Sequence, residues 1–292
     1  MEKKAGELVK LAERKAKSWV NIFGSGDKWE EAGELYEKAA ALYIFQKEYL
    51  QSAESLLKYA ECCEKTGSQH LSASAHRKAA TSFLKCTPKL TERALRSLKY
   101  ALDYHISENR FTMAAQIEEE IAELHAKNEN IPTACEHFSN AARYFETESQ
   151  EAHASKCWVR MAELWAEDQN YPVAAQLFED VANMTLNSKF QLGAKQYFFK
   201  SVLCYLAANY QQERIFMVTN KLEEFNNLDP NFCDSREANF LCSVCATIEE
   251  KNSQELKNLV REYNSLKKFD WWMQTIFLAV FNHLESIELD LT

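Results

Sequence analysis

Residues 131–162 read IPTACEHFSNAARYFETESQEAHASKCWVRMA, and this stretch holds two copies of one pattern. Ala134 and Ala141 flank Phe138, and about 20 residues later two further alanines flank Trp158. Small residues about two turns apart lie on one face of a helix, where they let a neighbouring helix axis come close. The large residue between them fills the remaining space. Each copy is therefore a helix that cannot bury this face alone and must stack on the next one.

The same spacing runs through most of the chain. The first small residue of each unit is Ala32, Ala53, Ala73, Ala94, Ala114, Ala134, Ala154, Ala174 or Ala194, and the second is Ala39, Ala60, Ala80, Ala101, Ala122, Ala141, Ala162 or Ala182. Breaks between helices are expected near Lys47, Gly67, Pro88, Asn109, Asn130, Ser149, Asn170 and Asn187. The pattern predicts an all-α fold, a tetratricopeptide-like solenoid of antiparallel helix hairpins with about 40 residues per hairpin. The hairpins are expected to form a twisted curved sheet capped by a C-terminal helical bundle.

Composition supports this class and excludes others. The 292 residues include only 6 Gly and 4 Pro, which disfavours a sheet protein. A formal net charge of -9 argues against an extended nucleic-acid surface, so no nucleic-acid partner is expected. No apolar run reaches the roughly 18–20 residues that cross a bilayer. The 9 cysteines are irregularly placed and are expected to stay reduced in the core, which predicts a cytoplasmic protein.

The extent of the alanine repeat divides the chain into four parts. We expect a basic amphipathic helix and an apolar loop in residues 1–28, the hairpin solenoid in 29–228, a helical bundle in 229–287 and an acidic tail in 288–292. Gly24 and Gly26 are expected to end the first helix in that loop. The last predicted helix, Asp270 to about Ile287, is strongly apolar and should cover the open end of the repeats. The tail beyond it is expected to be frayed.

The N-terminal loop carries large apolar residues beside lysines and arginines. Trp19, Ile22 and Phe23 either pack on the first repeat or dip into a membrane surface whose anionic head groups meet the basic flank. At about 1.5 to 3 kcal/mol per buried side chain, one such loop adheres only weakly. Useful membrane binding therefore needs several copies acting together.

The chain shows no catalytic motif. Gly24-Ser25-Gly26 lacks the later Gly-Lys of a phosphate-binding loop, and no His-Glu-x-x-His pair or nucleophile elbow is present. Cys242 and Cys245 have a zinc-like spacing but no second ligand pair. We therefore predict a protein that is not an enzyme and that uses no metal or cofactor.

Several stretches, spread from the first helix to the last residues, carry a resemblance to a known family. They are Glu13-Arg14-Lys15-Ala16-Lys17, Trp29-Glu30-Glu31-Ala32, Arg110-Phe111-Thr112-Met113-Ala114-Ala115, Ser155-Lys156-Cys157, Tyr197-Phe198-Phe199-Lys200, Asp229-Pro230-Asn231-Phe232, Asp234-Ser235-Arg236-Glu237 and Leu289-Asp290-Leu291. In this order they resemble alpha-SNAP, the soluble NSF attachment protein family, over essentially the whole chain. The sequence departs from the family's basic pattern at Gln116-Ile117-Glu118.

The resemblance implies an adaptor in vesicle-mediated transport. Family members lay a concave basic face along the SNARE four-helix bundle of syntaxin-, SNAP-25- and synaptobrevin-type proteins. Their C-terminal end recruits the hexameric AAA ATPase NSF and stimulates it to disassemble the bundle, so that SNAREs are recycled after membrane fusion. The chain is then a monomer alone, binds in several copies per SNARE complex and associates peripherally and weakly with anionic membranes.

The resemblance also implies which residues carry these contacts. The expected SNARE-binding residues are Arg110, Lys156, Arg160, Lys195, Lys200 and Arg236, and the expected NSF-binding and activating residues are Glu249, Glu250, Glu288, Asp290 and Leu291. Each of the cations could equally be a solvated helix residue, and an acidic terminus could simply be frayed. A general tetratricopeptide-like scaffold in another trafficking or chaperone complex is the alternative function.

Overall fold

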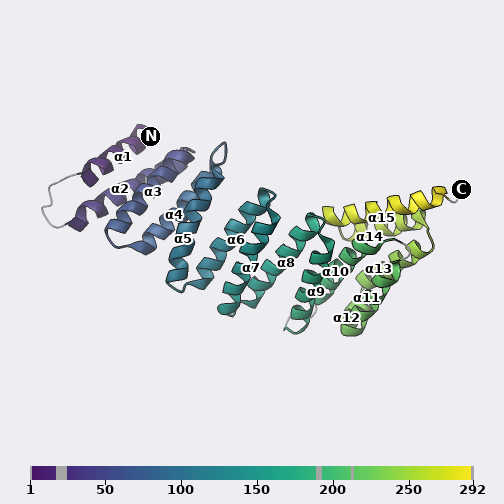
Figure 1. Ribbon diagram of the computed structural model, residues 1–292. Helices are drawn as coiled ribbons and strands as arrows, with labels where there is room; N and C mark the ends of the chain where they lie inside the picture. Colours follow the sequence, from purple (N-terminus) through teal and green to yellow (C-terminus); the bar gives the residue numbers. More distant parts are fainter. Residues whose placement is uncertain (1, 18–24, 189–192, 212–213, 291–292) are drawn as a thin grey trace. The chain divides into compact units, whose positions relative to one another are not determined.

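The computed structural model describes residues 2–17, 25–188, 193–211 and 214–290. Within these ranges the regular structure is entirely helical, which confirms the all-α prediction (Figure 1). The helices are α1 (Glu2–Lys17), α2 (Ser25–Phe45), α3 (Tyr49–Lys65), α4 (Gln69–Lys85), α5 (Thr91–Ser107), α6 (Phe111–Lys127), α7 (Ile131–Thr147), α8 (Glu151–Glu167), α9 (Tyr171–Leu186), α10 (Ala194–Asn209), α11 (Ile215–Leu228), α12 (Pro230–Cys233), α13 (Arg236–Glu249), α14 (Ser253–Leu266) and α15 (Trp271–Asp290). No described helix is both long enough and apolar enough to span a bilayer.

The regularly spaced alanines form the contacts between helices. Every one of the 17 alanines named above is 1% exposed or less. Most of the large residues between them are also buried, as Phe138 and Phe178 are, whereas Leu57 and Trp158 are only partly covered. A methyl group at these positions leaves room for the neighbouring helix, so the alanine spacing is confirmed as the packing seam.

Several connections between successive helices share one geometry. Lys47, Gly67, Asn109, Ser149 and Gln169 each have a positive φ, between 55 and 77°. The residue after each of them donates its backbone N–H to the carbonyl five positions back, in pairs such as Glu48 to Tyr43 and Asn170 to Trp165. This pattern is the Schellman cap, in which one left-handed residue ends a helix and turns the chain sharply. The predicted breaks are confirmed at these positions.

Polar side chains connect helices that are two apart in the order. Lys78 pairs with Glu37, Arg93 with Glu54, Arg77 with Glu120, Lys200 with Glu163 and Lys221 with Glu179. The partners are separated by 37 to 43 residues. One hairpin therefore repeats after about 40 residues, as the sequence predicts.

The chain forms two compact units. Described buried residues of the first form one large core and a smaller cluster around Tyr36, and those of the second form another core. One unit comprises residues 1–128 and 140–150, and the other comprises residues 129–139 and 151–292. The core of the first includes Phe83, Leu98 and Ile117, and that of the second runs without interruption from Ala162 to Leu284. In the second unit α15 packs against α8, α10 and α14.

Two details differ from expectation at the ends of helices. Gly26 lies in the first turn of α2, so it does not end the preceding helix, and Gly24 lies outside the described residues. The α15 helix continues to Asp290, so residues 288–290 are helical and the prediction of a frayed tail was wrong there. The backbone N–H and the hydroxyl of Ser253 both donate to the Glu288 carboxylate at 2.7 Å. This carboxylate sits at the positive N-terminal end of α14, where it accepts from a backbone N–H that has no partner within that helix.

Candidate partner-binding surfaces

The six candidate cations are divided between the two units. Arg110 belongs to the first unit, where it is exposed just before α6 and its guanidinium lies 6.0 Å from the Tyr104 ring. The other five belong to the second unit. On α8 Lys156 is exposed, and at the start of α10 Lys195 is half-buried.

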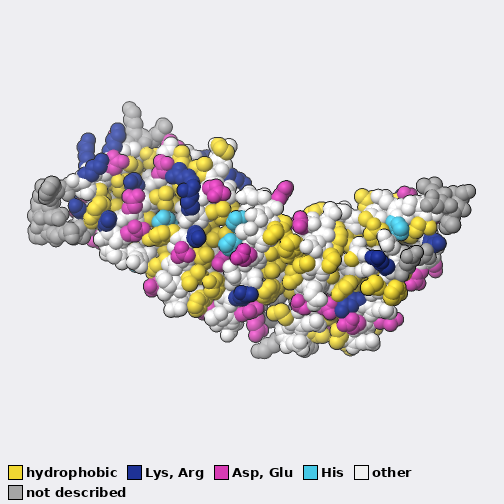
Figure 2. All heavy atoms as spheres, in the orientation of Figure 1, with side chains coloured by type: hydrophobic (Ala, Val, Ile, Leu, Met, Phe, Trp, Pro, Cys, Tyr) yellow, Lys and Arg dark blue, Asp and Glu magenta, His cyan; other side chains and the backbone are white. Residues whose placement is uncertain are grey.

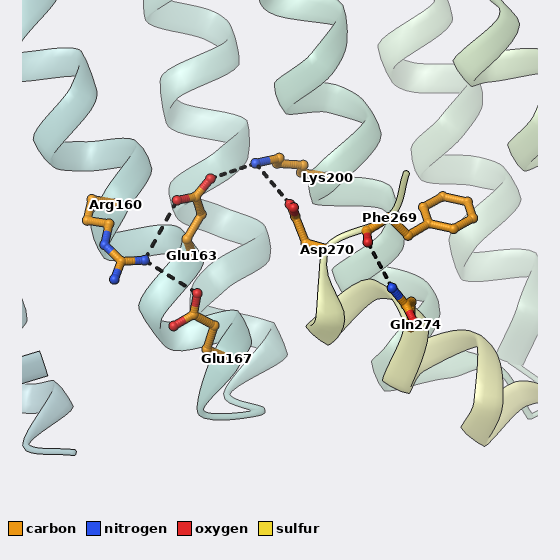
Figure 3. A network of polar contacts seen from close by, with 7 residues as sticks. All are labelled: Arg160, Glu163, Glu167, Lys200, Phe269, Asp270 and Gln274. Atoms are coloured by element: carbon orange, nitrogen blue, oxygen red, sulfur yellow. Dashed lines mark hydrogen bonds and ion pairs between the residues drawn. The ribbon is translucent and has the colours of Figure 1, made fainter. Parts of the chain in front are cut away.

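Arg160 and Lys200 lie in one network of ion pairs (Figure 3). The Lys200 ammonium is 2.7 Å from Glu163 and 3.8 Å from Asp270, and Arg160 is 3.9 Å from Glu163 and 3.4 Å from Glu167. Three carboxylates thus surround two cations. The Lys200 side chain is only 17% exposed. The network joins α8, α10 and the residue that precedes α15, so both cations have a structural role.

Arg236 is exposed at the start of α13. Its guanidinium lies 5.4 Å from the Tyr263 ring, and it shares the Glu237 carboxylate with Lys267, each at 3.9 Å. Burial, with Glu237 nearby, raises the pKa of Tyr263 to about 12, so this phenol is neutral at physiological pH. Sequence reasoning missed Lys267, although the pair Lys267-Lys268 before the last helix was a visible signal.

Gln116-Ile117-Glu118, the segment that departs from the basic pattern, lies on α6. Glu118 lies within α6 and is 4% exposed. The pKa of Tyr144 is raised mainly by burial of the phenol, and the negative charge of Glu118 adds to this shift. Gln116 is partly exposed. This segment therefore places one neutral side chain, and no fully exposed acid, where a basic patch was expected.

The candidate acidic residues lie near the C-terminal ends of helices. Glu249 is the last residue of α13 and Glu250 follows it, both exposed. Negative charge at a helix C-terminus is opposed by the helix dipole, so these two residues do not stabilise α13 through its dipole. Glu288 is bound by Ser253, and Asp290 ends α15. Leu291 lies outside the described residues, as do Trp19, Ile22 and Phe23.

The paired cysteines of α13 have no reactive features. Burial raises the pKa of Cys242, and it raises the pKa of Cys245 to about 12. Both are therefore thiols rather than thiolates at physiological pH. Across the described ranges no three His, Cys, Asp or Glu side chains are grouped so that they could hold a metal ion.

Comparison with known proteins identifies the family. The model of the family "Soluble NSF attachment protein, SNAP" matches residues 3–285. The chain belongs to this family. A bovine beta-soluble NSF attachment protein is 29% identical over 291 residues, covering 98% of this chain and 95% of that protein. A human alpha-soluble NSF attachment protein is 28% identical over 298 residues, covering 99% and 98%.

A solved structure supports the fold of the SNAP-family chain. A signal transduction ATPase from Pyrococcus horikoshii with a tetratricopeptide repeat sensor aligns with a TM-score of 0.52. It is 13% identical, and the alignment covers 97% of this chain and 45% of that one. The similarity concerns the tetratricopeptide-like fold alone. Family membership makes the chain an adaptor of the NSF and SNARE-disassembly machinery in vesicle transport, rather than an enzyme.

Proposed function

We propose that the chain binds assembled SNARE bundles through a basic face, recruits NSF through its C-terminal end and stimulates NSF to disassemble the bundle. The observation that carries the proposal is the family match over residues 3–285. The bundle is acidic on its outside, so binding needs cations despite the net charge of -9.

The candidate cations contribute in two ways. The exposed side chains of Arg110, Lys156 and Arg236 can meet acidic partner groups directly, and Lys195 can do so in part. Arg160 and Lys200 must first exchange their intramolecular carboxylates for those of the partner, so each contributes less. Exposed ion pairs are worth about 0.2–1 kcal/mol each, so affinity from charge alone requires several of them and falls with salt.

We propose that NSF meets Glu249, Glu250, Glu288, Asp290 and Leu291. Support comes from the exposure of Glu249 and Glu250 at the C-terminal end of α13, where their carboxylates can reach a basic partner. Leu291 is the residue proposed to couple binding to ATPase stimulation.

The membrane contact remains a proposal for Trp19, Ile22 and Phe23. Support comes from α1, which exposes Lys4, Lys10, Arg14 and Lys17. Figure 2 shows basic side chains gathered over this helix. Peripheral, weak association with anionic lipid follows if several monomers bind one SNARE complex and act together.

A binding assay tests the proposed function. Parent protein is mixed with assembled soluble SNARE bundle at low and high salt, with and without NSF. We expect binding that weakens with salt, and bundle disassembly only when NSF and ATP are present. The charge reversal Lys156→Glu should weaken binding, whereas Lys65→Glu, an exposed lysine outside the candidate set, should not.

A second variant separates recruitment from stimulation. Leu291→Ala should bind the bundle normally and fail to support disassembly. Failure of the parent to bind the bundle at any salt concentration would refute the proposal and favour a scaffold in another complex.

A further inference from the structure

The turn between α14 and α15, which Leu266 and Trp271 flank, is held by hydrogen bonds on both sides. The Phe269 backbone N–H donates to the Asn264 side chain at 2.9 Å. The Gln274 side chain donates to the Phe269 carbonyl at 2.9 Å, as Figure 3 shows. The Phe269 ring stacks on Tyr263 with centroids 5.1 Å apart. We call Leu266–Trp271 the corner. Because both sides of it are fixed, side chains that project from it are pre-organised.

Two large apolar side chains project from this corner into solvent. Leu266 is 64% exposed and Trp271 is 56% exposed, whereas the adjacent Trp272 is 1% exposed and stacks on Phe178. Core packing therefore explains Trp272 and leaves Trp271 unexplained. Large apolar side chains left exposed next to charged groups are typical of the core of an interaction site.

Candidate cations adjoin the corner on both sides. Lys200 lies 3.8 Å from the carboxylate of Asp270, the residue before Trp271. Arg236 stacks over Tyr263, which in turn stacks on Phe269. Lys267 belongs to the corner itself and shares Glu237 with Arg236. The apolar side chains are thus continuous with the basic residues of the second unit.

We propose that the corner is an apolar anchor of the partner-binding face, and that Trp271 and Leu266 are buried against the acidic helical bundle when it binds. This inference rests on the proposed function and adds specificity-determining residues to it. The surrounding cations select an acidic partner. Three carboxylates already neutralise Arg160 and Lys200. Charge near the corner therefore sets the orientation of the bound partner more than the affinity for it. Tryptophan in a rigid setting ringed by polar groups is the residue most enriched among interface hot spots.

Salt dependence separates this anchor from a charge contact. Affinity for the assembled soluble SNARE bundle is measured at low and high salt for the parent, Trp271→Ala and Trp271→Gln. We expect both variants to weaken binding about tenfold at each salt concentration, because burial of apolar surface is not screened. For each variant, the ratio of the affinity at low salt to the affinity at high salt should equal that of the parent. Arg236→Ala combined with Lys267→Ala should instead lower that ratio.

A matched control excludes a general effect of surface hydrophobicity. Phe216 on α11 is also 56% exposed, and Phe216→Ala should bind as the parent does. Trp271→Phe should retain most of the affinity, and thermal unfolding should show every variant folded. Parent-like affinity of Trp271→Ala and Trp271→Gln would overturn the anchor while leaving the proposed function intact. Absence of bundle binding by the parent would overturn both.

Discussion

Alanine and glutamate illustrate how single side chains act in this chain. At a seam position the alanine methyl is all that fits, because the neighbouring helix occupies the space beyond it. Glu288 acts differently, since it ties the end of α15 to the start of α14 through Ser253. The alanine positions could be predicted from their spacing. The Glu288 contact could not, because its partner lies 35 residues away in sequence.

The packing seam predicts that leucine destabilises the fold at one alanine of α8 and has little effect at another. Ala154 is buried and Ala152 is exposed. Ala154→Leu should lower the free energy of unfolding by about 1–3 kcal/mol, because the larger side chain overpacks the seam. Ala152→Leu should change it by less than about 0.5 kcal/mol. Urea unfolding measures both, and equal effects would contradict a close-packed seam.

Glu288 predicts a local and pH-dependent effect. Its pKa lies below the usual 4.5 because the hydroxyl and N–H of Ser253 donate to the carboxylate. The folded state therefore favours the ionised carboxylate. The contribution of Glu288 to folding stability is present above pH 4.5 and is lost as pH falls through the lowered pKa. Glu288→Ala should speed hydrogen exchange at the Ser253 amide at neutral pH. Glu285→Ala, an exposed residue of the same helix, should leave that amide unchanged.

The helix connections act at the scale of whole elements. A left-handed residue followed by the next helix directs successive helices into antiparallel hairpins. Asn and Gly suit that conformation, so Gly67 and Asn109 could be read from sequence. Of the other three, Ser149 is itself a loop-forming residue and Gln169 directly precedes the break expected at Asn170, whereas Lys47 carries no such chemical signature. The helices themselves are amphipathic and their existence was predictable.

Substitution by glycine should therefore change stability in opposite directions at two glutamines, Gln169 and Gln176. Gln169 has φ of 62°, so Gln169→Gly should stabilise by about 0.5–1 kcal/mol by removing the left-handed penalty. Gln176 lies within α9, where Gln176→Gly should destabilise by a similar amount, about 0.5–1 kcal/mol. The two thermal midpoints should move in opposite directions. A shift of the same sign at both sites would show that the connection is unstrained.

At the scale of the whole molecule, the repeats divide into two compact units, and one core connects α8 to α15 in the second. Each helix contacts mainly its neighbours, so stability is expected to be a sum of local contributions rather than one cooperative block. The second core includes α10 to α15 together with the last repeats. The predicted boundary at residue 229 therefore marks a change in sequence rhythm within a continuous core.

Damage to one core should stay within its unit. The Phe198 ring is buried, with its centroid 4.5 Å from that of Phe225 and 5.6 Å from that of Phe232. Phe198→Ala should cost about 3–5 kcal/mol because it leaves a cavity. Hydrogen exchange should accelerate in α9 to α13 and stay unchanged in α3 to α5. Uniform acceleration along the chain would indicate a single cooperative unit.

The sequence alone determined the helical class, the alanine seam, the length of a hairpin and the family, because these follow from patterns within a few turns of one helix. It also suggested candidate cations for the proposed binding face. Only the tertiary structure decided that Arg160 and Lys200 are held by carboxylates and that Glu288 caps another helix. It likewise decided that Trp272 is core while Trp271 faces solvent. Such partners come together through stacking of helices far apart in sequence, which local periodicity does not encode.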